Sequence, residues 1–227
     1  MKENLLITPL GNKSLSHAWV SEKSNFDSIF ICYEDLTKDN KIKYLNLTSQ
    51  VYEGRGSKFQ LVKSFIENNK ELINKYKFIW IPDDDIAISI NDINTLYKTA
   101  NDFQLDICSP SMNGFTSHTI TNPIKGNVLR YTSFVEVTAP LFSLESLLKL
   151  YHSFDFNDSS WGFDYYWPFK LGYPKDKIAI LDKVTMTHTN PVGGNYDRFP
   201  THPSIEMDEL LTKYNINPIQ KIYSTIC

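Results

Sequence analysis

Cysteine is scarce in this sequence of 227 residues, which contains Cys32, Cys108 and Cys227 and no other cysteine. Cysteines this far apart neither form the paired spacings of a zinc site nor supply a disulfide framework. Two of them lie inside apolar runs, where a reduced thiol packs as a small hydrophobic group. The cysteine content therefore argues against a disulfide-stapled secreted domain and predicts a cytoplasmic protein with reduced thiols.

A long apolar run and a surplus of one charge are also missing. Residues 1–14 are apolar for only a few positions before Gly11, too few for a signal peptide or a membrane span. Lysine and arginine number 23 against 26 acidic residues, for a formal net charge of −3. Nucleic-acid binding requires a basic patch, so the sequence predicts no nucleic-acid partner and no integral membrane segment. Peripheral attachment to a membrane stays open.

What the chain does contain is an alternation of strand and helix patterns. Short apolar runs rich in β-branched and aromatic residues predict buried strands, at 4–10, 28–34, 42–47, 77–82, 105–110, 128–143, 177–182 and 183–189. Helical spacing of apolar residues, with serine caps, predicts helices over 57–76, from about 89, after 143 and from about 204. This alternation predicts an α/β fold with a mixed, mostly parallel central sheet and helices on both faces. We expect a single domain over 1–227, with ligands at the carboxyl ends of the strands.

The most informative segment is KFIWIPDDDIAI, residues 77–88, because Asp83, Asp84 and Asp85 directly follow a predicted buried strand. Adjacent carboxylates repel one another unless a cation or solvent compensates their charge. Mn²⁺ and Mg²⁺ prefer carboxylate, phosphate and water oxygens, so a divalent cation is a natural partner. The alternative is a solvated turn whose aspartates cap the next helix. The position after a mid-chain hydrophobic strand favours the metal.

A second segment, SSWGFDYYWP at 159–168, places the single acid Asp164 among aromatic residues. An acid in such surroundings can have a raised pKa, which suits it to accept a proton from a hydroxyl group. Aromatic side chains also stack against sugar rings. The alternative is a helix start at which the helix dipole stabilises Asp164, and the residues alone do not decide between the two.

A third segment, VTMTHT at 184–189, ends a predicted strand with His188. A histidine at such a position is more often a structural hydrogen-bonding group than a ligand. Its neutral imidazole could nevertheless complete a metal site that the aspartates open.

The order of these parts resembles that of glycosyltransferases with the GT-A fold, a Rossmann-like α/β architecture. Such proteins have an N-terminal nucleotide-binding half, an Asp-x-Asp at the end of a central strand, an aromatic Trp-Gly-x-Asp motif and a late histidine. The chain looks even more like a widespread, largely uncharacterised group of glycosyltransferase-like proteins that share the acidic triplet and the later Trp-Gly-x-Asp. The resemblance covers residues 4–195. It implies a nucleotide-binding half over about 1–110 and an acceptor-binding half over about 111–227.

The resemblance also implies a role for each matching residue. Asp83, Asp85 and His188 would hold Mn²⁺ or Mg²⁺ against the diphosphate of a nucleoside-diphosphate sugar, expected to be a UDP-sugar. Asp164 would activate the hydroxyl of a glycan or other acceptor, with inversion at the anomeric carbon. The remaining expected contacts are Thr8, Pro9, Gly11, Lys58, Asp83 and Asp84 for the nucleotide sugar, and Trp161, Gly162, Tyr165 and Trp167 for the acceptor.

Two other functions fit parts of the sequence. Phosphohydrolases of the haloacid-dehalogenase type also carry Asp-x-Asp after a strand. Their motif normally opens the chain, and Ala87 stands where they have threonine or valine. A carbohydrate-binding domain that keeps the GT-A fold without catalysis is the second alternative.

Several positions stay open on the sequence alone. Arg130 and Glu136 interrupt a buried-looking run, which fits either residues that line a cleft or an internal ion pair. The loop 113–127, which includes His118, could face either substrate. Pro82 removes a strand hydrogen-bond donor immediately before the acidic triplet, which leaves the register of the metal site open.

Overall fold

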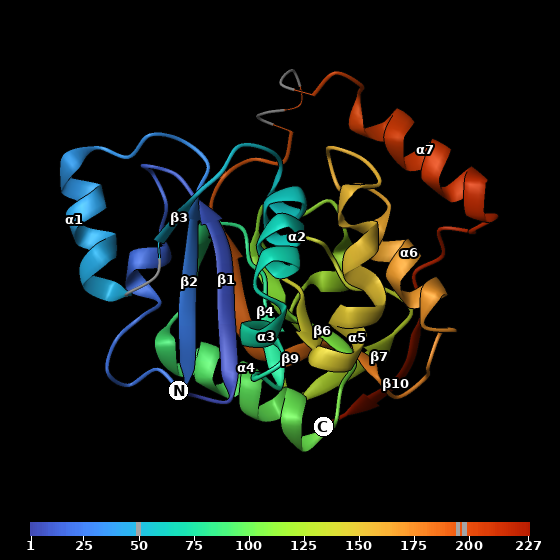
Figure 1. The fold of residues 1–227 in the computed structure, drawn as a ribbon. Helices are drawn as coiled ribbons and strands as arrows, with labels where there is room; N and C mark the ends of the chain where they lie inside the picture. The colour runs from blue at the N-terminus through green and yellow to red at the C-terminus, as the bar shows by residue number, and fades with distance from the viewer. Residues whose placement is uncertain (49–50, 194–195, 197–198) are drawn as a thin grey trace.

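The computed structural model describes residues 1–48, 51–193, 196 and 199–227, and within them ten strands form one sheet (Figure 1). The sheet order is β10-β7-β9-β6-β8-β4-β1-β2-β3, with β5 paired to β9. The strands are β1 Asn4–Leu10, β2 Phe26–Cys32, β3 Val51–Glu53, β4 Phe78–Trp80, β5 Ile86–Ala87, β6 Ile107–Gly114, β7 Leu129–Thr132, β8 Leu141–Ser143, β9 Ile178–His188 and β10 Ile222–Ile226. Strands β5, β7 and β8 run against the direction that the others share. The predicted mixed, mostly parallel sheet is confirmed.

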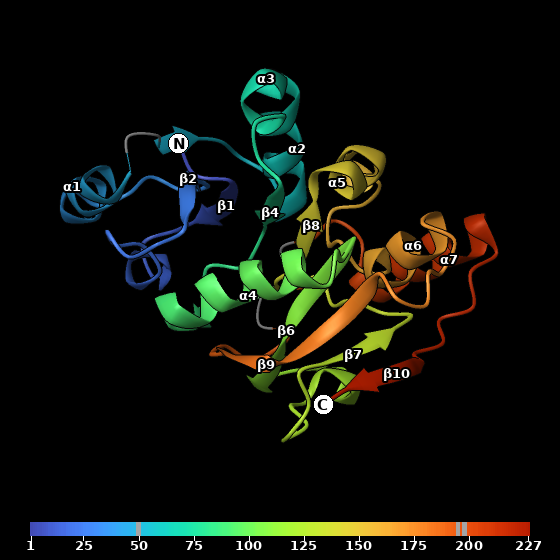
Figure 2. The same cartoon turned by 90° about the horizontal axis from the view of Figure 1, so that it is seen from below.

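Helices cover both faces of this sheet. Helices α2, α5 and α6 lie on one face and α4 on the other (Figure 2), while α1 packs at the β2 end of the sheet through Tyr44 and Phe30. The helices are α1 Lys38–Leu47, α2 Lys58–Asn68, α3 Lys70–Ile73, α4 Ile90–Asp102, α5 Leu144–Leu150, α6 Phe163–Lys170 and α7 Pro203–Tyr214, with short 3₁₀ helices at Ser16–Ala18, Thr119–Thr121 and Tyr151–Asp155.

Each face has its own aromatic core. On the α2 side, Phe59 and Trp167 are fully buried, with ring centroids 5.3 Å apart. On the α4 side, Trp19 lies against Trp80, with ring centroids 5.7 Å apart. Large aromatic side chains contribute much of the burial energy of a core, so the end of β4 is fixed from both sides.

Three predicted helix starts are confirmed. Gln60 accepts a hydrogen bond from the backbone N–H of Ser57 (3.1 Å) at the start of α2. The hydroxyl of Ser89 accepts from Asp92 N–H at the start of α4, and that of Ser143 accepts from Ser146 N–H at the start of α5. Such caps satisfy backbone donors that the helix leaves free.

The strand expected at 42–47 is wrong, because this segment belongs to helix α1. The hydroxyl of Thr37 caps that helix by accepting from Asn40 N–H. Within the helix Tyr44 is buried against Phe30, with centroids 5.4 Å apart, whereas Ile42 remains about half exposed. The apolar alternation resembles that of a strand, but one buried tyrosine attaches this helix to the sheet.

Two other strand boundaries also differ from expectation. The two strands expected at 177–182 and 183–189 form the single strand β9, whose pairing with β6 shifts register after Leu181. The one strand expected at 128–143 divides into β7 and β8. The residues between β7 and β8 run past the end of β4, which brings Glu136 and its neighbours towards the acidic triplet.

Arg130 forms a buried ion pair with Asp182, and their side chains are 2 % and 0 % exposed. The guanidinium donates two hydrogen bonds to the carboxylate and one each to the carbonyls of Ile120 and Asn122. Arg130 thus belongs to an internal ion pair and does not line the cleft, but its partner is Asp182 and not Glu136. The pair also holds the loop after β6 against β9.

Replacing Arg130 by alanine is expected to lower the free energy of unfolding by about 3–5 kcal/mol, because it leaves Asp182 buried without its cation. Urea unfolding followed by circular dichroism measures the change. The control is Lys149→Ala, which removes an exposed ion pair with Glu145 and should leave the midpoint near the wild-type value. Equal midpoints for the two variants would contradict the prediction.

Among the described residues, no helix is both long and apolar enough to span a lipid bilayer.

Candidate active site

The acidic triplet follows β4 at the carboxyl end of the central strands. Ile81 N–H donates to the carbonyl of Pro140 (2.9 Å), and Asp83 N–H donates to that of Thr138 (2.8 Å). Pro82 lies between these two donors and accepts a hydrogen bond from the Thr8 hydroxyl at its carbonyl (3.0 Å). The proline therefore does not interrupt the pairing with the segment before β8, which resolves the register of the triplet.

The two-residue strand β5 brings His188 to the triplet. Ile86 of β5 lies opposite His188 of β9 in an antiparallel pair. Thr189 then donates to the Asp85 carbonyl through both its backbone N–H and its hydroxyl. As a result His188 Nε2 lies 3.2 Å from Asp85 Oδ2, which also accepts from the Asn190 amide (2.9 Å).

Asp83, Asp85 and His188 together form a candidate metal centre. One ligand atom from each of the three lies within 4.8 Å of the others. His188 Nδ1 lies 2.7 Å from the carbonyl of Phe115; with Nδ1 as donor, Nε2 is left to face the aspartates, an arrangement common among metal-binding histidines. Asp85 Oδ1 is buried without a hydrogen-bond partner among the residues that the structure describes. An unpaired buried carboxylate oxygen is costly, and a divalent cation held by two carboxylates and an imidazole would satisfy it.

The charges of this centre perturb one another. Burial alone would lower the pKa of His188, but the hydrogen bond and charge of Asp85 and the Phe115 carbonyl outweigh it and raise the pKa to about 9. Burial alone would raise the pKa of Asp85, yet the hydrogen bonds from His188 and Asn190 hold it below its usual value. Without metal, a protonated His188 thus occupies the place of the cation.

Metal binding is consequently expected to strengthen by about tenfold per pH unit between pH 7 and 8.5, because each bound ion displaces one proton from His188. The sign follows from the raised pKa: His188 is protonated below about 9, and only the neutral imidazole binds metal. Calorimetric titration of Mn²⁺ at several pH values measures the slope. A matched His188→Gln variant should bind weakly and without this slope, and a pH-independent wild-type affinity would exclude His188 as a ligand.

Lys58 enters the same site from the first residue of α2. Its ammonium lies 2.6 Å from Asp83 Oδ1 and donates to the carbonyls of Val137 (2.6 Å) and Thr138 (3.0 Å). Burial lowers the pKa of Lys58 and raises that of Asp83. Three partners occupy the three N–H bonds of the ammonium, so contact with a phosphate requires the lysine to release one of them.

Asp84 points away from this metal centre and anchors the loop after β1. Its Oδ2 accepts from Gly11 N–H (2.8 Å) and from the Tyr33 hydroxyl (3.2 Å). A Cβ at position 11 would lie 2.5 Å from the Tyr33 hydroxyl and from a Glu34 carboxylate oxygen, so a larger residue would have to displace these side chains. Burial raises the pKa of Asp84 to about 6. Thr8 is fully buried and bonded to Pro82, which leaves it a supporting residue rather than a ligand contact.

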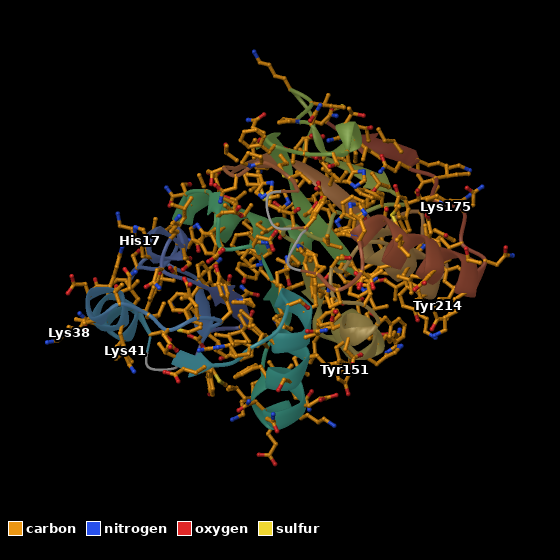
Figure 3. The ribbon with its side chains drawn as sticks, turned by 90° about the horizontal axis from the view of Figure 1, so that it is seen from above. His17, Lys38, Lys41, Tyr151, Lys175 and Tyr214 are labelled. Carbon is orange, nitrogen blue, oxygen red and sulfur yellow. The ribbon has the colours of Figure 1, made fainter. Side chains whose placement is uncertain are left out.

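A cleft of about 600 Å³ opens over these residues, within the usual range for small-molecule sites. Four residues expected to contact the nucleotide sugar, Pro9, Lys58, Asp83 and Asp84, line it, and so does Asp85. The other lining residues are Tyr33, Gly56, Ser57, Phe59, Gln60, Val137, Asp158, Ser159, Ser160, Phe199 and Pro200. Figure 3 looks onto this end of the molecule, where α1 with Lys38 and Lys41 lies at one margin and α7 with Tyr214 at the other.

The sequence patterns missed most of these additional lining residues. Tyr33 directly follows β2, and a position after a parallel strand could have marked it. Ser159 and Ser160 open the segment SSWGFDYYWP, whose pattern points to its acid and its aromatic residues and not to these serines. Gln60 donates to Asp158 (2.6 Å) across the cleft, a long-range contact that no local pattern indicates.

Asp164 lies in the first turn of α6, immediately after the loop that contains Ser159 and Ser160. It is 5 % exposed, and burial together with the charge of Glu136 raises its pKa to about 8. Glu136 is also buried, and its own pKa is raised to about 7, chiefly by burial. The hydroxyls of Thr116 and Thr138 donate to Glu136, and the charges of His188 and Asp83 also act on it. Glu136 therefore belongs to the site and not to an ion pair with Arg130.

Of the four residues expected to contact an acceptor, Trp161 is partly exposed, whereas Gly162, Tyr165 and Trp167 are buried. Trp161 is partly exposed and lies edge-on to Tyr196, with centroids 5.4 Å apart. Tyr165 is 8 % exposed, and its hydroxyl accepts from the Gln220 amide. Gly162 is buried at the N-cap of α6 with φ +89°, where a Cβ would approach Leu210 and Met207.

Trp167 corrects the expectation of an acceptor contact. Its side chain is 0 % exposed and its indole N–H donates to the Ser153 hydroxyl (3.1 Å). It is one of the largest side chains in the core on the α2 side of the sheet. All residues from Phe163 to Pro168 are buried, and this tryptophan packs among the aromatic rings of the core, so it supports α6 and does not reach a ligand.

Comparison with known protein families and with curated proteins finds no match for this chain. Solved structures do match. S. aureus TarS residues 1–349 align with a TM-score of 0.58 at 15 % identity, over 83 % of this chain and 60 % of TarS. GalNAc-T7 in complex with UDP, GalNAc and Mn²⁺ aligns with a TM-score of 0.61 at 11 % identity, over 84 % of this chain and 44 % of GalNAc-T7. A complex of TarS with UDP-GlcNAc aligns with a TM-score of 0.54 at 14 % identity, over 90 % of this chain and 61 % of the TarS chain.

These similarities show the fold. The chain has the GT-A architecture expected from the order of its motifs. It spans less than two thirds of the TarS and GalNAc-T7 chains described above. At such low identity a shared fold does not establish a shared activity, which has to be argued from the site.

Proposed function

We propose that this chain is a metal-dependent glycosyltransferase that moves a sugar from a nucleoside-diphosphate sugar, a UDP-sugar, to a hydroxyl group of a glycan or other acceptor. The observation that carries the proposal is the centre formed by Asp83, Asp85 and His188, whose two aspartates line the cleft of about 600 Å³. Structures with the same fold contain UDP, UDP-GlcNAc or UDP with Mn²⁺, which supports both the donor and the metal.

The donor side of the reaction rests on the metal centre. Asp83, Asp85 and His188 would hold Mn²⁺ or Mg²⁺, which supplies positive charge to the diphosphate as it leaves. Gly11 and Asp84 shape the wall next to Tyr33 and Pro9, where we place the nucleotide. The ammonium of Lys58 neutralises the charge of Asp83. When the diphosphate binds, this ammonium could leave Asp83 and contact a phosphate oxygen.

On the acceptor side, Asp164 takes the proton of the attacking hydroxyl. The acceptor oxygen forms a bond to the anomeric carbon while the bond from that carbon to the diphosphate oxygen breaks, and the electron pair leaves with the nucleoside diphosphate. A direct displacement of this kind inverts the anomeric configuration. We place the acceptor between Asp164 and the loop with Trp161, within the half of the chain after residue 110.

A single catalytic domain over residues 1–227 and a cytoplasmic location, free or peripherally attached to a membrane, complete the proposal. The fold supports the first point, because both substrate halves belong to one continuous sheet. The buried cysteines Cys32 and Cys108 support the second, since neither forms a disulfide in the structure.

The two alternatives have less support. In this chain the triplet follows β4, whereas the Asp-x-Asp of a haloacid-dehalogenase-type phosphohydrolase normally opens the chain. A binding domain without catalysis would have no use for a buried acid with the raised pKa of Asp164. Hydrolysis of UDP-GlcNAc that requires Mn²⁺ would separate an active enzyme from such a domain.

A thermal-shift panel tests the proposal directly. Nucleoside diphosphates and UDP-GlcNAc are each added with and without Mn²⁺, because a specific ligand raises the melting temperature by mass action. We expect UDP to stabilise the protein only when the metal is present. No shift with any nucleotide in the presence of Mn²⁺ would overturn the proposal.

A further inference from the structure

The loop after β6 and the segment before β10 meet at Asp164. His118 of this loop has its Nε2 3.6 Å from Asp164 Oδ2, and the two side chains are 26 % and 7 % exposed. The imidazole packs on Phe134, with ring centroids 4.7 Å apart. Nothing in the metal centre or the donor cleft uses this histidine.

Gln220 fixes the tautomer of His118. Its amide nitrogen lies 2.8 Å from His118 Nδ1 and 3.0 Å from the Tyr165 hydroxyl. In this orientation of the amide its nitrogen donates to Nδ1, which therefore accepts. Burial lowers the pKa of His118, which keeps the imidazole neutral near pH 7. Its one proton is then on Nε2, which faces Asp164.

The loop that presents His118 is firmly held. The Thr121 hydroxyl donates to the His118 carbonyl (2.7 Å), and His118 N–H donates to the Thr116 hydroxyl (3.0 Å). The buried guanidinium of Arg130 binds the carbonyl of Ile120 two residues later. A group held in this way changes little during a reaction, which is the requirement for preorganised electrostatic stabilisation.

The other neighbours of Asp164 act on its ionised form in both directions. Glu136 adds a negative charge and, with burial, raises the pKa of Asp164. Burial also raises the pKa of Tyr165, so its phenol is neutral. Tyr165 N–H donates to Asp164 Oδ1 (3.1 Å). The second oxygen, Oδ2, faces the Nε2–H of His118.

We propose that His118, oriented by Gln220, is a positioning residue that donates a hydrogen bond from Nε2 to the ionised carboxylate of Asp164. The inference rests on the proposed function, because it assigns His118 to the proton acceptor of that reaction. The acceptor proton passes to Asp164, and His118 keeps its own proton throughout. The 3.6 Å separation is slightly longer than a hydrogen bond, so the proposal requires it to shorten when the carboxyl ionises.

Nuclear magnetic resonance on the whole chain tests this without any turnover. Labelled histidine nitrogens report the tautomer of His118, and labelled aspartate carboxyl carbons report the titration of Asp164. We expect the Nε2–H tautomer in the wild type. His118→Phe keeps a ring against Phe134 and should raise the pKa of Asp164 by about one pH unit, because a donor to the charged form is lost. His118→Gln retains a donor and should stay near the wild type.

Gln220→Glu supplies the opposite test. A carboxylate beside Nδ1 accepts a hydrogen bond, whereas the amide nitrogen donates one. We therefore expect the proton of His118 to move from Nε2 to Nδ1, or the imidazole to become charged. The control is His152→Phe, at a histidine of the 3₁₀ helix Tyr151–Asp155, which should leave Asp164 unchanged. An Nδ1–H tautomer in the wild type, or an unmoved Asp164 titration in His118→Phe, would overturn the proposal.

A kinetic arm separates this inference from the proposed function. The rate of UDP release from UDP-GlcNAc with Mn²⁺ is measured against pH. His118→Phe should shift the acidic limb of this pH–rate profile to higher pH by about one unit, with little change in KM for the donor. Failure of the wild type to bind UDP with Mn²⁺ would remove the transferase proposal. A wild type that turns over, with an unshifted limb in His118→Phe, would remove only the role of His118.

Discussion

Replacing Asp85 by alanine is expected to abolish the stabilisation that UDP confers in the presence of Mn²⁺. Asp85 supplies the buried oxygen without a partner and is the carboxylate closest to His188. Since changes around metal ligands already weaken metal binding 10- to 100-fold, loss of a ligand should weaken Mn²⁺ binding by about 100-fold or more. Calorimetric titration of Mn²⁺ and the thermal shift with UDP measure the two effects.

The matched control for this variant is Asp102→Asn, which removes an exposed carboxylate at the end of α4 that pairs with Lys98. It lies outside the cleft and should bind Mn²⁺ and UDP as the wild type does. An Asp85→Ala protein that keeps a metal-dependent UDP shift would show that the metal, if any, binds elsewhere. The folded state of each variant is checked by its melting temperature without ligands.

Much of this site was predictable because the residues that matter follow local rules. An apolar strand followed by three acids defines its position in the sheet, and serine caps define the starts of α2, α4 and α5. The partnership of Asp85 with His188 was inferred from a resemblance and not from spacing. Its physical cause is β5, a pair of residues whose bridge to β9 fixes the register. No sequence period can indicate a strand this short.

Other parts of the site depend on long-range packing. The segment WGFDYYW contains both Asp164 and Trp167, which are three positions apart on one helix, and composition alone could not tell the site residue from the core residue. The apolar residues at 42–47 fit a strand pattern, but the segment is helical. Its packing depends on one buried residue, Tyr44, which contacts Phe30. Glu136 interrupts an apolar run, but only the path of the chain past β4 brings it close enough for the charges of His188 and Asp83 to act on it.

Replacing Asp164 by asparagine should lower turnover by about 10²- to 10⁴-fold, the usual contribution of a general base, while binding of UDP with Mn²⁺ stays near the wild-type value. The wild-type rate should rise with pH through the pKa of about 8, because only the ionised carboxylate accepts a proton. Release of UDP from UDP-GlcNAc measures the rate. Full turnover in Asp164→Asn would exclude Asp164 as the base.

Glu136→Gln supplies the complementary control, because it removes a negative charge beside Asp164 and leaves Asp164 itself in place. Since the charge of Glu136 raises the pKa of Asp164, its removal should move the acidic limb of the rate profile to lower pH. The two variants thus predict different outcomes: Asp164→Asn removes the limb together with the activity, whereas Glu136→Gln shifts the limb and retains turnover. Loss of both turnover and limb in Glu136→Gln, with UDP binding intact, would instead identify Glu136 as the proton acceptor.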